Sequence, residues 1–134
     1  MLRFALVVAA LLVALPALGA ALDTPPGERL DAAALAALYA TGFHAEGTSP
    51  RAGPLTLDLL PDGRVLIDAP GEWRWHLDGD SFCMTRRILG LAREYCMIVY
   101  RVGDSQYDAY FAIRAPDTEA RTPGRKNFSF TLRP

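Results

Sequence analysis

Apolar and polar side chains alternate along most of the chain after Gly42, as they do in β-strands that bury one face. Leu57 and Leu59 are separated by one polar residue and lead into the turn signal Pro61-Asp62-Gly63. The dipeptide Asp78-Gly79 is a second turn signal, typical of tight hairpins. The pattern therefore predicts antiparallel strands joined by short turns.

Pairing the strands across these turns brings the large apolar side chains of successive strands to one face. A shift of one residue in any strand would turn its side chains to the opposite face. The shared face therefore supports the register. The cross-strand partners that we expect include Leu59 with Val65, Ile67 with Trp73, Trp75 with Phe82, Cys83 with Cys96, Val99 with Ala109, and Tyr95 with Ile113.

Two further strands, at 43–47 and 127–132, raise the expected number to eight. An up-and-down meander of eight strands can close on itself and so remove its edge strands. Before the strands, residues 28–40 carry an apolar stripe with helical spacing, and Gly42 follows as a stop signal. The pattern predicts an all-β fold with one N-terminal helix, in which the antiparallel meander closes as a small barrel. A two-sheet sandwich is the alternative.

The N-terminus has the pattern of a cleavable secretory signal peptide. Arg3 precedes an uncharged apolar run from Phe4 to Leu15, and small residues follow Pro16. The run is too short to span a bilayer, which takes about 20 residues. We therefore expect a signal peptide at 1–20, one domain at 21–134 without a transmembrane segment, and a periplasmic or secreted location.

The two cysteines of the chain are Cys83 and Cys96. An even number of cysteines in an exported protein indicates disulfide bonding, because the compartment is oxidising. The expected register places the two residues opposite each other on neighbouring strands. We expect one disulfide on the outer face of the sheet.

Several of these features occur together in a known type of fold. A helix followed by a glycine, then a short strand, tight hairpins and a pair of cysteines resemble lipocalin-like barrels. The stretch from Leu35 to Ile113 is similar to small exported proteins of Gram-negative bacteria whose function is uncharacterised. The resemblance implies a small lipocalin-like β-barrel that binds a ligand. The matching motifs are Pro61-Asp62-Gly63, Gly71-Glu72-Trp73, Asp78-Gly79, Cys83 and Cys96.

Composition and motifs do not indicate a catalytic or nucleic-acid-binding protein. The formal net charge is −1, whereas nucleic-acid binding needs a concentrated basic surface. His44 and His76 fall on outward positions without a third metal ligand. The carboxylates fall mostly at turns or outward positions, and no serine lies in a nucleophile motif. We therefore expect no enzyme activity, no cofactor and no metal.

Four aromatic residues are the candidates for ligand binding. They share the predicted inner face, where they either line an apolar pocket or simply fill the core. These residues are Trp73, Trp75, Tyr95 and Phe111.

The segment 86–93 is the candidate for contact with a partner. It places three arginines around aliphatic side chains, which is typical of a loop that contacts a partner or an anionic membrane. The alternative is a loop that folds its aliphatic side chains over the barrel mouth. The candidate residues are Arg86, Arg87, Leu89 and Arg93.

These candidates support two functional hypotheses. The first is an exported, non-enzymatic module that binds a small apolar or amphipathic ligand at the barrel mouth, and it requires a cavity beneath the aromatic face. The alternative is an envelope protein-interaction module, an inhibitor or an accessory subunit, that acts through residues 86–93.

Overall fold

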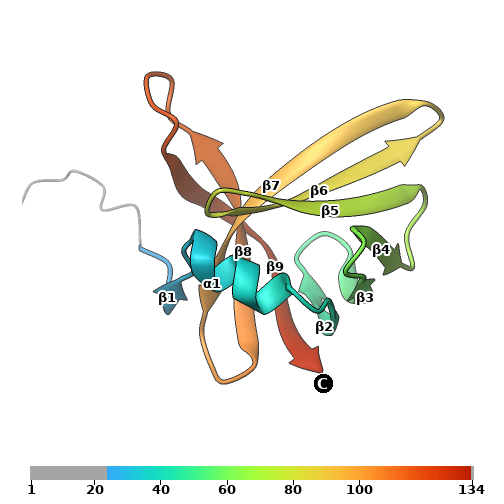
Figure 1. The fold of residues 1–134 in the computed structure, drawn as a ribbon, viewed down its shortest axis with the longest axis horizontal. Helices are drawn as coiled ribbons and strands as arrows, with labels where there is room; N and C mark the ends of the chain where they lie inside the picture. The colour runs from blue at the N-terminus through green and yellow to red at the C-terminus, as the bar shows by residue number, and fades with distance from the viewer. Residues whose placement is uncertain (1–23, 134) are drawn as a thin grey trace, which may run out of the picture.

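The strands from β2 to β9 are all antiparallel to their neighbours, and together they form one closed barrel (Figure 1). The computed structural model describes residues 24–133, so the signal peptide predicted at 1–20 lies outside the described residues. The expected eight-stranded meander is confirmed in preference to the sandwich. The elements are β1 (Glu28–Arg29), α1 (Ala32–Tyr39), β2 (Phe43–Ser49), β3 (Gly53–Leu59), β4 (Arg64–Ile67), β5 (Glu72–Asp78), β6 (Ser81–Ile88), β7 (Leu91–Arg101), β8 (Gln106–Arg114) and β9 (Arg121–Arg133).

The barrel closes where β2 pairs with β9. In this pairing, Ala45 lies opposite Leu132 and Gly47 lies opposite Phe130. The other edge of β9 pairs with β8, which in turn pairs with β7. The hydrogen-bonded circuit is therefore continuous, and β1 adds two residues beside the end of β7.

β7 and β8 pair along only part of their lengths. In the described part of the chain, their pairing ends at Met97 and Phe111. Beyond that point β7 continues as a hairpin with β6 and β8 continues as a hairpin with β9, and the two hairpins diverge (Figure 1). The expected pairing of Tyr95 with Ile113 is therefore wrong, because Ile113 pairs with Thr122 of β9 instead.

The register between β5 and β6 differs from the expected one by two residues. Trp75 lies opposite Met84 and not opposite Phe82. The reason is the position of the tight turn. Asp78 pairs with Ser81, so the two turn residues are Gly79 and Asp80, one position later than the predicted Asp78 and Gly79. A shift of two residues keeps every side chain on its original face. The inner face is therefore as predicted, although the partners are not.

The register between β4 and β5 is also shifted by two residues. Trp73 lies opposite Val65 and not opposite Ile67. The backbone N–H of Trp75 donates to the Gly63 carbonyl at 2.8 Å, which holds β5 against the turn between β3 and β4. The remaining expected pairs are confirmed, namely Leu59 with Val65, Cys83 with Cys96 and Val99 with Ala109.

The predicted disulfide joins Cys83 of β6 to Cys96 of β7. The neighbours of Cys83 in β6, Phe82 and Met84, belong to the barrel core. Because side chains alternate along a strand, the two cysteines lie on the outer face, as expected.

The helix is shorter than the predicted 28–40. α1 begins at Ala32, because the Asp31 side chain accepts a hydrogen bond from the Ala34 backbone N–H at 2.8 Å and so caps the helix. The segment before it forms β1, and the Leu30 N–H donates to the backbone of β7 at 2.9 Å. The predicted start of the helix is therefore wrong, because those residues extend the sheet.

α1 and the aromatic side chains beneath it close one end of the barrel. Tyr39, at the end of the helix, is 1% exposed and stacks on Phe82 with the ring centroids 4.7 Å apart. Phe43 and Trp75 also pack against Tyr39. α1 lies beneath β5 and β6 in Figure 1. This end of the barrel is therefore filled by side chains.

After Phe43, small residues occupy the inner face of β2. Ala45, Gly47 and Ser49 alternate along it, and Phe130 of β9 lies opposite Gly47. A Cβ atom on Gly47 would lie 2.0 Å from the Ser129 carbonyl oxygen and 2.8 Å from the Phe128 ring. β2 and β9 can approach this closely only because Gly47 has no side chain.

Replacing Gly47 by alanine is expected to destabilise the barrel by about 1–3 kcal/mol, because the added methyl group forces β2 and β9 apart. Urea denaturation followed by circular dichroism measures the loss. The matched control is Thr48→Ala on the exposed face of the same strand, which is expected to change stability by less than about 0.5 kcal/mol. Equal losses in the two variants would contradict the role assigned to Gly47.

Candidate functional site

The barrel contains a cavity of about 390 Å³ that opens at the end opposite α1. Every barrel strand from β2 to β9 contributes side chains to its wall, so both sides of the β2–β9 seam line the cavity. The wall is mainly apolar, and its residues include Ala45, Leu57, Ile67, Trp73, Met84, Tyr95, Met97, Ala109, Phe111 and Phe128.

The floor of the cavity is aromatic and uncharged. Tyr39 lines it together with Phe43 and Phe82. Burial, with a smaller contribution from Tyr107, raises the pKa of the Tyr39 phenol far above its ordinary value. The hydroxyl group therefore remains protonated at any physiological pH.

The mouth of the cavity is polar and carries two arginines. Ser49 Oγ accepts hydrogen bonds from the backbone N–H groups of Arg51 and Ala52, at 3.3 and 3.4 Å, which fixes the turn between β2 and β3. Arg86 Nε donates to the Pro70 carbonyl at 3.0 Å and so ties β6 to the turn between β4 and β5. Arg51 and Arg86 are the charged residues among the described residues that line the cavity.

Trp73 connects the mouth to the apolar wall. Its indole N–H donates to the Pro70 carbonyl at 3.2 Å, and the Arg86 guanidinium lies 5.4 Å from the ring centroid. Its ring also stacks on Tyr95, with the centroids 6.5 Å apart. The aromatic wall and the basic mouth are therefore in direct contact.

Three of the four predicted ligand-binding residues line the cavity, and the fourth does not. Trp73, Tyr95 and Phe111 are in its wall. Trp75 instead packs beside Tyr39 at the closed end, and its indole N–H donates to the Leu60 carbonyl at 2.8 Å. Trp75 therefore belongs to the core.

Arg51 and Asn127 line the cavity but were not expected to do so from the sequence. The order of the turns could have predicted the position of Arg51, because alternate turns of a meander lie at the same end of a barrel. The turns at 50–52 and 69–71 and the segment 86–93 therefore share one end. Asn127 gave no comparable signal, and its amide donates to the Met97 sulfur at 3.2 Å inside the barrel.

The predicted partner segment lies at the same end as the mouth. Arg86 belongs to the mouth itself, whereas Arg87, Leu89 and Arg93 are exposed. Leu89 is 97% exposed, so it does not fold over the cavity.

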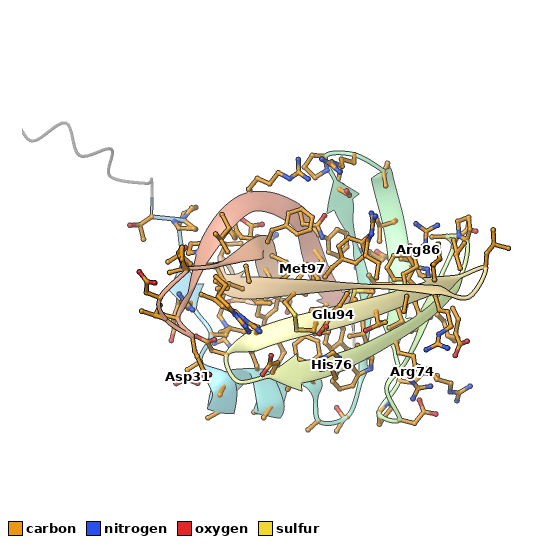
Figure 2. The ribbon with its side chains drawn as sticks, turned by 90° about the horizontal axis from the view of Figure 1, so that it is seen from above. Asp31, Arg74, His76, Arg86, Glu94 and Met97 are labelled. Carbon is orange, nitrogen blue, oxygen red and sulfur yellow. A yellow bond between two sulfur atoms is a disulfide. The ribbon has the colours of Figure 1, made fainter. Side chains whose placement is uncertain are left out.

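His76, Cys83 and Glu94 form a cluster of metal-ligand types on the outer face of the barrel. Their ligand atoms lie within 4.8 Å of one another, and His76 Nε2 is 3.1 Å from Glu94 Oε1 (Figure 2). The Cys83 sulfur is bonded to Cys96, and a disulfide sulfur is not the thiolate that binds zinc. The cluster is therefore a surface contact between a histidine and a carboxylate beside a disulfide.

Comparison of the chain with protein-family models, with curated proteins and with solved structures gives no match. Among residues 24–133, the chain has no helix long and apolar enough to cross a membrane.

His44 lies outside the cavity in a second polar cluster. Its Nδ1 is 2.6 Å from Asp58 Oδ1, and its Nε2 is 3.6 Å from Glu46 Oε1. The hydrogen bond from His44 to Asp58 raises the pKa of the imidazole above its ordinary value, and Glu46 adds to the effect. The pair therefore favours the protonated histidine.

Replacing Asp58 by asparagine is expected to lower the pKa of His44 toward its ordinary value of about 6.5. NMR titration of the imidazole C–H signals measures the change, and Asp62→Asn is the control, because the Asp62 carboxylate bonds to Arg64 and not to His44. Because the pKa is raised in the folded state, the resulting stabilisation is full below about pH 6.5 and is lost as the pH rises through the folded-state value. An unchanged titration in Asp58→Asn would contradict this assignment.

Proposed function

We propose that this protein is a non-enzymatic binding module for a small amphipathic ligand. The apolar part of the ligand lies in the barrel and an anionic group lies at the mouth. The observation that supports this proposal is the open apolar cavity of about 390 Å³ with arginines at its entrance. Its size falls within the range of about 300–1,000 Å³ that is usual for small-molecule sites.

The distribution of side-chain size supports a cavity that is kept open. Ala45 and Ala109 are small, buried residues in the wall, although larger apolar side chains would fill the space between the strands. An apolar chain that enters the barrel replaces water along this wall, and the hydrophobic effect favours that exchange. The cavity is therefore suited to the hydrocarbon part of a ligand.

The charges at the mouth favour an anionic group over a cationic one. Arg51 and Arg86 line the cavity, and no acidic residue does so among the described residues. A guanidinium group binds a carboxylate or a phosphate through paired hydrogen bonds. A ligand with such a group at one end would satisfy both regions of the site.

The lining residues support binding in preference to catalysis. The described cavity wall contains no histidine, cysteine or carboxylate, which are the usual bases and nucleophiles. The closed meander is consistent with the lipocalin-like resemblance, and an exported carrier agrees with the expected periplasmic or secreted location. The alternative hypothesis, a protein-interaction module acting through residues 86–93, stays a prediction.

Binding of a fatty-acid anion is expected to change the emission of Trp73 and not that of Trp75. Trp73 lines the cavity, whereas Trp75 is packed at the closed end. Fluorescence titration with dodecanoate measures this in two single-tryptophan variants, Trp75→Phe and Trp73→Phe. The cavity-filling variant Ala109→Met is expected to weaken the response of Trp73. Equal responses of both tryptophans, or none from Trp73, would count against the proposed site.

Replacing Arg51 by glutamine is expected to weaken dodecanoate binding about tenfold, because a hydrogen bond to a charged group is lost. Binding of dodecanol, which has the same chain without the charge, should change little. Arg64→Gln is the matched control, since Arg64 lies at the opposite end beside Asp62. If Arg51→Gln weakens both ligands equally, the anionic preference is refuted while the apolar site remains.

A further inference from the structure

The β6–β7 tip comprises residues 86–93, and its end, residues 88–91, extends beyond the part of β6 that pairs with β5 (Figure 1). Ile88 and Leu91 form its last strand pair, and Leu89 and Gly90 make the turn. Both turn residues have positive φ angles, 50° for Leu89 and 79° for Gly90. The tip is therefore an ordered two-residue hairpin.

The aliphatic side chains of the tip point in different directions. Ile88 packs against the turn between β4 and β5, since a Cβ atom on Gly71 would lie 2.7 Å from its Cγ1 atom. Leu89 and Leu91 are 97% and 78% exposed. The two leucines therefore neither cover the mouth nor join the core.

Leu89 is an unfavourable residue for its backbone conformation. A left-handed turn position favours glycine, asparagine or aspartate, and a large apolar residue there is rare. The same position holds the most exposed of the large apolar side chains in the described chain. The residue therefore satisfies neither the turn nor the core, which points to a role in contact with something outside the molecule.

Repulsion between arginines also destabilises the strand pairing at the tip. Arg86 and Arg93 are directly opposite each other across β6 and β7, where like charges destabilise a strand pair. Arg87 is the third arginine, and the segment 86–93 contains no acidic residue. The tip therefore carries three arginines and two exposed leucines, and Glu72 of β5 lies opposite Arg87.

We propose that the β6–β7 tip docks onto an anionic lipid bilayer. Leu89 and Leu91 enter the boundary between headgroups and acyl chains, and Arg87 and Arg93 contact the lipid phosphates. A bilayer fits this surface better than a protein does, because a stable protein interface buries about 800 Å² on each partner and two leucines on a convex turn cannot supply it. Since Arg86 belongs to the mouth, docking brings the cavity entrance close to the membrane.

Flotation of the purified protein with vesicles tests this inference, which does not depend on what the cavity binds. We expect binding to vesicles of phosphatidylglycerol and phosphatidylcholine in equal parts, and at least about tenfold weaker binding to pure phosphatidylcholine. Arg87→Gln combined with Arg93→Gln should reduce the difference between the two vesicle types. Higher salt should weaken binding to the anionic vesicles.

The leucine contribution is tested by Leu89→Ser combined with Leu91→Ser, which is expected to weaken vesicle binding at least about tenfold. Leu66→Ser is the matched control, because Leu66 is 52% exposed on β4, away from the tip. Equal binding of the double variant and the control overturns the proposal. Failure of the wild-type protein to bind the anionic vesicles also overturns it and leaves the tip as a contact for a protein.

Leu89→Asn separates docking from folding. Asparagine tolerates the left-handed conformation, so the thermal midpoint is expected to rise by a few degrees while vesicle binding falls. A rise in the midpoint with unchanged vesicle binding would show that Leu89 is not the inserted residue and would contradict the proposal.

Discussion

The close approach of β2 and β9 is the constraint on which the rest of the structure depends. These are the first and last strands of the barrel, and their pairing removes the two edges that an open meander would expose. The approach requires Gly47, because any side chain there would meet the backbone at Ser129. Once the circuit is closed, one sheet encloses its own inner face and needs no second sheet to cover it.

The same strand sets the shape of the interior. Beyond Phe43, β2 contributes only small residues such as Ala45 and Gly47 to the inside, while the facing strands contribute aromatic rings. At one end α1 adds Tyr39, and the space is filled. At the other end no element among residues 24–133 plays that part, and the cavity reaches solvent between turns that carry arginines. A filled core and an open site thus follow from which end of the meander the helix covers.

Sequence alternation predicted the faces of the strands better than their partners. The pattern repeats every two residues, so Trp75 is inward whether it faces Phe82 or Met84, and the hydrophobic pattern cannot distinguish the two registers. The same limit applies to the site. Trp73 and Trp75 look equivalent in the sequence, and only the position of α1 at one end separates a cavity residue from a core residue. The start of that helix was missed because pairing of β1 with β7 overrides an apolar stripe.

The disulfide lies where the two hairpins part. From Met97 onward β7 is paired with β8. In the described part of the chain, residues 91–95 pair with β6 alone. A local opening that begins at the turn can spread along this arm one strand pair at a time. The covalent link between Cys83 and Cys96 stops it before the shared wall. Fraying of β7 from β6 is therefore confined to the hairpin end, while β6 stays paired with β5 and the β2–β9 seam stays closed.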